Sequence, residues 1–376
     1  MAQAAKPLHV APDRAIHGAQ AAVSSGRDLD QALAAVEEQI RAARQALRGV
    51  YLDAVELTAR RDRDPQARLQ HMLGTLHICA ALLCRSQGDE HQAHEHWVRA
   101  VATGTTDPSP RQYLVESYLA RGRPLDALSQ LEMMGNGRHD ALSLLMFGRD
   151  MRVEGHLDVA DLADARAIAA DPSGLVGDVV AAARTRYPTA APSAEATPSI
   201  LQRISRAFTQ GNRGADLMEL RALVGAMPRS ADAWFELAAL IQIGDRAIDG
   251  SVIHDAVQEL VASQTLDDDR LKALDQAGKG YEFAFGLAPY DAKHLLALAV
   301  TYALLERWTD ALELLNGYRQ AAPKQALGHA LFAIVARLAD EDAAAEAALD
   351  QARAIDPNNP LVGLARQAGQ ARDLST

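Results

Sequence analysis

Histidines gather between residues 71 and 96, and their spacing comes closest in this sequence to that of a metal site. The stretch contains His71, His77, His91, His94 and His96, together with Cys79 and Cys84. Residues three apart share one face of a helix, so His91 and His94 would lie together, with His77 on the preceding antiparallel helix. Three such imidazoles suit zinc. Neither a C-x-x-C pair nor H-E-x-x-H is present, so we predict ordinary surface and groove histidines, no metal and no cofactor.

Motifs of catalysis are otherwise missing from the sequence. The segment GKGYEFAFG at 278–286 has two glycines two residues apart, but it falls inside a predicted helix and follows no strand, so it is not a phosphate-binding loop. The acidic run 340–342 lies at a predicted turn, where carboxylates cap helices. We therefore predict that the chain is not an enzyme. An accessory subunit or a small enzyme that uses the histidine cluster is the alternative.

Composition narrows the classes of partner and the compartment. The net charge is −11 and no stretch is strongly basic, which argues against nucleic acid as the main partner. No apolar run is long enough to cross a membrane, and the N-terminus lacks the apolar core of a signal peptide. Two cysteines form no disulfide framework, so we expect the cytoplasm. The excess of arginine over lysine and the abundant alanine suggest a bacterial, GC-rich genome.

A period of 34 residues is the strongest pattern in the chain. It relates three prolines, three alanines and three bulky residues: Pro289, Pro323 and Pro357; Ala277, Ala311 and Ala345; Tyr281, Leu315 and Leu349. In the first half, Gly88, Gly122 and Gly155 keep nearly the same step. This period predicts stacked helical hairpins, with small residues where helices cross and a proline that ends each second helix.

These positions resemble the tetratricopeptide repeat family over roughly residues 70–360. The clearest unit has Leu298, Ala299, Tyr302, Ala311, Leu315, Tyr318 and Pro323, and the last has Phe332, Ala333, Ala336, Ala345, Leu349, Ala352 and Pro357. The resemblance implies an all-α, right-handed α-solenoid of six or seven hairpins. It also implies a non-catalytic scaffold or adaptor that binds a segment of a partner protein in a concave groove.

The sequence divides into four parts. We expect a tail and a long heptad-patterned helix in 1–68, a first repeat block in 69–184, a Pro/Ala/Ser linker in 185–199 and a second block in 200–376. The second block would carry an insertion at 244–269, with its own helix near 251–263, and a capping helix at 360–373.

The long helix, expected over about 15–60, has a seven-residue apolar pattern. Its members are Leu29, Leu33, Val36, Ile40, Ala43, Leu47, Val50, Ala54 and Leu57. Such a stripe either forms an intermolecular coiled coil or packs on the chain's own repeats. A homo-oligomer assembled through residues 29–57 is therefore a second hypothesis of function.

The resemblance also implies where a partner would bind, because ligands of this family lie along the first helices of the hairpins. In the first block this places Arg85, Glu116, Arg149 and Arg152 in the groove, and in the second block Leu296, Val300, Leu304, Ile334 and Arg337. Arginine forks suit carboxylates, so we expect the first groove to take an acidic or C-terminal segment. The apolar second groove would take an amphipathic helix, either of a partner or of the chain's own insertion or residues 360–373.

Overall fold

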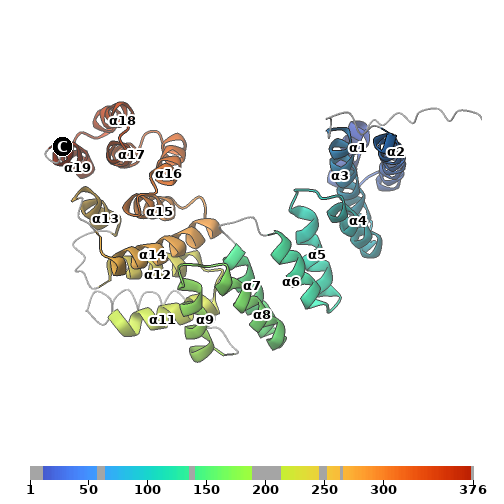
Figure 1. The fold of residues 1–376 in the computed structure, drawn as a ribbon, viewed down its shortest axis with the longest axis horizontal. Coiled ribbons are helices and arrows are strands. Elements are labelled where there is room, and N and C mark those ends of the chain that lie inside the picture. The colour runs from blue at the N-terminus through green and yellow to red at the C-terminus, as the bar shows by residue number, and fades with distance from the viewer. Residues whose placement is uncertain are drawn as a thin grey trace, which may run out of the picture. The chain divides into compact units, whose positions relative to one another are not determined.

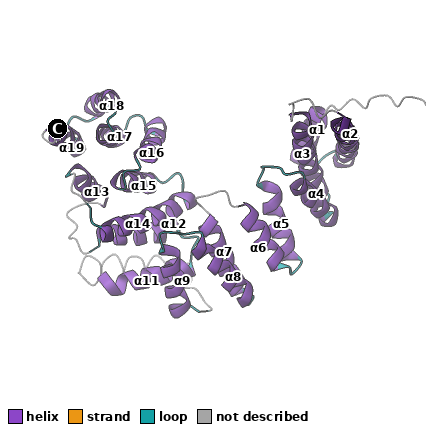
Figure 2. Cartoon of the chain, in the orientation of Figure 1, coloured by secondary structure: helices purple, strands orange, loops and turns teal. Residues whose placement is uncertain are grey.

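The computed structural model describes residues 12–56, 64–134, 140–188, 213–244, 252–262 and 266–373. Within these ranges the regular structure is all α-helix, joined by turns and short loops (Figure 2). In the same ranges, no helix is both long enough and apolar enough to span a membrane. The all-α solenoid of helical hairpins expected from the sequence is confirmed. The chain divides into two compact units, Met1–Gly135 and Asn136–Thr376.

The first unit contains six described helices (Figure 1). They are α1 (Pro12–Ser25), α2 (Leu29–Glu56), α3 (Asp64–Ser86), α4 (Glu90–Ala102), α5 (Ser109–Ala120) and α6 (Pro124–Met134). Each helix packs on the one before it, and α1 also packs on α3.

The second unit continues the hairpins in sequence order. Its described helices are α7 (Asp140–Val153), α8 (Leu157–Ala169), α9 (Leu175–Arg186), α11 (Arg213–Ala226), α12 (Ala231–Ile243), α13 (Val252–Val261), α14 (Asp268–Leu287), α15 (Ala292–Leu304), α16 (Trp308–Ala321), α17 (Ala326–Leu338), α18 (Asp342–Ile355) and α19 (Pro360–Asp373). The predicted insertion helix and capping helix are α13 and α19. Asp267 caps α14, accepting a hydrogen bond from the Arg270 amide at 2.7 Å.

Five hairpin turns close in the same way. In each, the residue after the left-handed position donates its N–H to the carbonyl five residues earlier, at 2.8 to 2.9 Å. The left-handed positions are Gly88, Gly122, Gly155, Glu306 and Asp340. Such a turn satisfies carbonyls that the end of a helix leaves without a partner. The prolines of the 34-residue period lie two residues beyond the ends of α14, α16 and α18, where they stop the helix.

The predicted long N-terminal helix is two helices. The chain breaks between α1 and α2, where Gly26 and Asp28 both adopt positive φ angles, 67° and 56°. The heptad stripe of α2 lies in a core shared with α1 and α3, which includes Val36, Ile40 and Ala43. The described part of the stripe therefore packs on the chain's own helices. Its members Val50 and Ala54 fall where side chains are not described, and Leu57 lies outside the described residues.

The compact units divide earlier than the predicted linker. The sequence placed the division at 185–199, whereas the units part at residues 135/136. The physical reason is packing across the linker, because α9 packs on α11, and α7 also contacts α11. Residues 189–199 lie outside the described residues.

Glycine allows a very close approach between α9 and α11. A Cβ added at Gly225 would lie 2.6 Å from the Val179 carbonyl oxygen and 2.6 Å from the Ala183 Cβ. Neither atom is the end of a flexible side chain, so the helices would have to move apart. Packing that is this tight makes position 225 intolerant of any side chain.

We expect Gly225→Ala to lower the free energy of unfolding by about 2 kcal/mol, because overpacking costs roughly 1–3 kcal/mol. Gly317→Ala is the matched control, since nothing lies within 4 Å of a Cβ added there in α16. The control should raise stability by about 0.5–1 kcal/mol through the better helix propensity of alanine. Urea unfolding followed by circular dichroism measures both. Equal changes in the free energy of unfolding for the two substitutions would contradict the close approach of α9 and α11 at Gly225.

Candidate functional site

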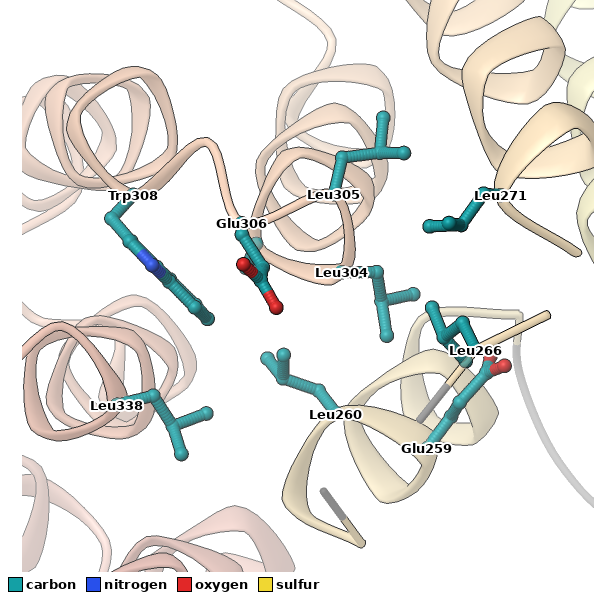
Figure 3. A pocket seen from close by; sticks show the side chains of 10 residues that line it. Glu259, Leu260, Leu266, Leu271, Leu304, Leu305, Glu306, Trp308 and Leu338 are labelled. Carbon is teal, nitrogen blue, oxygen red and sulfur yellow. The ribbon is translucent and has the colours of Figure 1, made fainter. Parts of the chain in front are cut away.

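A pocket of about 530 Å³ lies in the second unit, between the insertion helix and the ends of α15 and α17. Its lining is mostly apolar: Leu260, Leu266, Leu271, Ala303, Leu304, Leu305, Trp308 and Leu338, with Glu259 and Glu306. Figure 3 shows Trp308 and Leu338 on one side and Leu266 and Leu271 on the other. Leu260 and Leu304 lie between them.

An ion pair fixes the insertion helix beside this pocket. Arg270 of α14 donates two hydrogen bonds to the Glu259 carboxylate of α13, at 2.8 and 2.7 Å. The same guanidinium also donates to the Gln242 carbonyl at the end of α12. Both partners of the ion pair are largely buried. A bidentate pair holds its groups in a defined geometry, so Arg270 joins three helices at one edge of the pocket.

Glu306 is the unusual residue of the pocket. It occupies the left-handed turn position between α15 and α16, with φ of 57°, where equivalent turns of the first half have glycine. Its carboxylate points into the pocket, between Trp308 and Leu304 (Figure 3). Among the described residues no hydrogen bond or ion pair is recorded for this exposed side chain. Its backbone conformation costs about 1–2 kcal/mol relative to an ordinary one.

We expect Glu306→Gly to raise the free energy of unfolding by about 0.5–1 kcal/mol, since glycine removes the left-handed strain at some cost in unfolded-state entropy. The reverse substitution Gly122→Ala, at φ of 66°, should lower it by about 1 kcal/mol. Urea unfolding measures both changes in the free energy of unfolding, from the shift of the midpoint when the dependence of that free energy on urea concentration is unchanged. A loss of stability in Glu306→Gly would mean that the carboxylate makes a stabilising contact in the folded chain.

The apolar residues predicted to face a partner lie beneath the chain's own helices. Leu296, Val300 and Ile334 are between 0 and 3% exposed. Helix α13 packs on α15, and α19 packs on α17, as Figure 1 also shows. Leu304 differs from these three residues because its side chain lines the pocket. Arg337 lies at the edge of the same face, mostly buried, and forms an ion pair with Glu346 of α18. Contact of these residues with a partner stays a prediction.

Two of the residues predicted for the first groove pair with each other. Arg85 of α3 donates to the Glu116 carboxylate of α5 at 3.4 Å, and Glu90 lies 3.8 Å away. The guanidinium also covers the Tyr113 ring at 4.8 Å, and Tyr113 stacks on Trp97. Exposed pairs of this kind contribute about 0–1 kcal/mol, so a partner could exchange them at little cost.

The other two arginines lie in the second unit and differ from each other. Arg152 is paired with two carboxylates, because its Nη2 donates to Asp161 at 2.7 Å and to Asp164 at 2.9 Å. Arg149 is buried and only 7% exposed. Its Nη1 donates to the Tyr187 carbonyl at 3.4 Å, whereas its Nε and Nη2 have no partner in the described structure.

The histidine cluster resolves into a buried pair. The Nδ1 atoms of His77 and His96 lie 2.9 Å apart, and Arg44 Nη2 lies 3.2 Å from His77 Nε2. Arginine only donates, so His77 accepts at Nε2 and donates from Nδ1 to His96. His91 and His94 do not join this pair, since His91 is exposed and His94 bonds to Ser117. The described residues hold no group of three candidate metal ligands.

Burial lowers the pKa of His77 to about 3, helped by the charges of His96 and Arg44. Burial also lowers the pKa of His96. An unfolded histidine has a pKa of about 6.5. Between these values the unfolded chain binds more protons than the folded one, so stability falls as pH falls.

Unfolding free energies should therefore be constant above about pH 6.5 and decrease below it. The slope for each of these histidines is expected to approach about 1.4 kcal/mol per pH unit. Urea titrations at pH 7.5, 6.0 and 5.0 measure this. His77→Gln should flatten the slope, while His91→Gln, at an exposed position, should keep it. Identical pH profiles of the two variants would contradict a role for the buried pair.

Sequence reasoning missed most of the pocket. From the sequence, four of its residues fall in segments for which we predicted only an insertion, a helix cap or the start of a helix. These residues are Leu260, Leu266, Leu271 and Trp308. One signal was available at Glu306, because it lies 34 residues before Asp340 and at the turn position that holds glycine in the first half. An acidic residue at a turn position that favours glycine indicates a role beyond forming the turn.

Comparisons with known proteins identify no family for this chain. No family model matches the sequence, and no curated protein matches it. Among solved structures, the P58(IPK) TPR domain aligns over 97% of this chain and 99% of that chain, at 10% identity and a TM-score of 0.24. A score this low does not establish a shared arrangement in space, so the fold assignment rests on the hairpins themselves.

Proposed function

We propose that this chain is a non-catalytic scaffold of the tetratricopeptide type that binds a segment of a partner protein. The observation that carries the proposal is the apolar pocket between α13 and the ends of α15 and α17. Leu304 belongs both to this pocket and to the set of residues expected to contact a partner. Leu296, Val300 and Ile334 do not line the pocket in this structure.

The chemistry of the pocket favours a protein segment over a small substrate. Its volume lies in the range of ligand pockets, but such pockets also hold several converging polar groups. Here Glu259 is already bound by Arg270, which leaves Glu306 as the available charged group of the lining. A large apolar side chain that fills an apolar pocket is the usual anchor of a protein interface.

Glu306 defines the chemistry expected beside that anchor. A carboxylate at the mouth of an apolar pocket is complementary to lysine or arginine, and the net charge of −11 attracts basic segments. Strained backbone also tends to be kept at functional positions. We therefore propose that the occupant is a short segment with a bulky apolar residue next to a basic one.

Random dodecapeptides displayed on phage and selected on the immobilised full-length chain test this proposal. The expected peptides pair a Leu, Phe or Trp with a neighbouring Lys or Arg, and they quench or shift the fluorescence of Trp308. Glu306→Lys should weaken their binding by about tenfold or more, because a favourable charge contact becomes repulsive. Trp308→Phe should remove the fluorescence change.

Asp340→Lys is the matched control, since it makes the same kind of charge change at the same left-handed turn position one repeat later. It should bind the selected peptides as the wild type does. Selected peptides without basic residues, or peptides that bind Glu306→Lys equally well, would rule out this pocket as the binding site.

The oligomeric hypothesis has less support. Residues 29–47 of its stripe face α1 and α3 of the same chain, so the described part of the stripe is already covered. No specific contact in the described structure favours assembly through this helix over the pocket proposal.

A further inference from the structure

We infer that the hollow around Arg149 is a binding site for a small monatomic anion, with chloride as its ligand. The hollow lies among α7, α8, α9 and α11 of the second unit, distinct from the pocket at α13. Its wall includes Leu145, Arg152, Val180, Tyr187 and Gly225. This inference does not depend on the proposed partner-binding function.

The unpaired atoms of Arg149 point to a ligand. Nε and Nη2 lack partners among the described residues, while Nη1 donates to the Tyr187 carbonyl. Nε and Nη2 form one edge of the guanidinium, so their N–H groups point in the same direction and can share one acceptor. A buried charge with two unused donors is costly unless something binds it.

The nearby carboxylates are already bound by other arginines. Asp150 accepts two hydrogen bonds from Arg229, at 2.7 and 2.6 Å. Asp164 lines the hollow, but Arg152 and Arg184 bind it at 2.9 and 2.8 Å. Asp161 binds the same two arginines.

The balance of charge in this cluster is positive. Counting the described residues, three guanidinium groups (Arg149, Arg152 and Arg184) face two carboxylates (Asp161 and Asp164), so one positive charge is left. Burial and the neighbouring Arg152 lower the pKa of Arg149, but arginine stays charged in proteins. A water molecule would accept the two N–H groups without neutralising the charge, whereas an anion does both.

Size decides which anion. The hollow has a volume of about 20 Å³, compared with about 530 Å³ for the pocket at α13. A space of at least roughly 10–15 Å³ holds one water-sized group. A halide is close to this size, and its apolar neighbours would be Leu145 and Val180. Because Nε and Nη2 are themselves buried, the Arg149 side chain would shift slightly to meet the anion. Phosphate and sulfate, each with four oxygens around a central atom, are too large.

The test uses the full chain labelled with ¹⁵N-arginine, at constant ionic strength set by sodium gluconate. Chloride is titrated in, and the Nε–Hε signals of the arginines are followed by NMR. We expect one signal, assigned to Arg149 by its loss in Arg149→Lys, to shift and saturate with a dissociation constant on the order of 10 mM. Formate is titrated in parallel as the smallest carboxylate.

Arg353 provides the internal control. Its Nε is also buried without a partner among the described residues, while its Nη1 is 3.2 Å from Asp350. Its signal should stay in place, and Arg353→Lys should leave the chloride response unchanged. No shift of Arg149, or the same non-saturating shift at several arginines, would overturn the site. Saturation by formate without a response to chloride would overturn the assignment to a halide.

A second measurement remains valid if Arg149→Lys folds poorly. The excess line width of ³⁵Cl in the presence of wild-type protein reports bound chloride, and bromide should displace it in competition. We expect the excess to fall at least fivefold in Arg149→Lys or Arg149→Met, and to persist in Arg353→Met. Equal line widths with Arg149→Met and wild type would also overturn the inference.

Discussion

The hydrogen bond that closes the five matching hairpin turns is the constraint on which the repeats depend. It joins the sixth residue of the turn to the carbonyl of the first, and it requires a left-handed residue in between. The chain then reverses at once, so two helices lie antiparallel and must approach closely. The fully buried Ala311 and Ala345 fit this requirement, and the 34-residue step follows from repeating it.

Stacking the hairpins leaves the apolar helices α15 and α17 of the second unit to be covered. Helices α15 and α17 are apolar on nearly all sides, and most of their residues are buried. A helix of this kind has to be covered by other helices. The insertion helix α13 and the terminal helix α19 provide that cover. Helix α13 has ten residues and α15 has thirteen. At 1.5 Å per residue, α13 is therefore about 4.5 Å shorter than the helix that it covers. The pocket lies where both helices end.

The repeats could be predicted from the sequence, because their periodic residues act locally. Prolines after second helices, alanines at crossings and glycines at turns each do one task within one hairpin. The break at Gly26–Asp28 was missed because the heptad stripe dominates a segment whose break depends on two backbone angles. The pocket was missed because its residues come from five separate segments brought together only by packing. Arg149 was selected for contact with a partner, which stays a prediction. Its burial could not be predicted, because it depends on α9 and α11, which no pattern in α7 reveals.

Unpaired charged groups distinguish the two hollows from the rest of the second unit. Arg152 and Arg270 are also buried there, and each has a carboxylate on its guanidinium. In the part of the chain that the structure describes, Arg221 and Arg353 lack a partner at Nε and still bind a carboxylate through another nitrogen. Among the described residues no carboxylate pairs with Arg149, and Glu306 keeps an unfavourable backbone conformation beside a cavity. The cost at Arg149 is an unpaired buried charge, and the cost at Glu306 is a left-handed backbone beside an apolar pocket. A bound group of opposite charge would offset each of these costs.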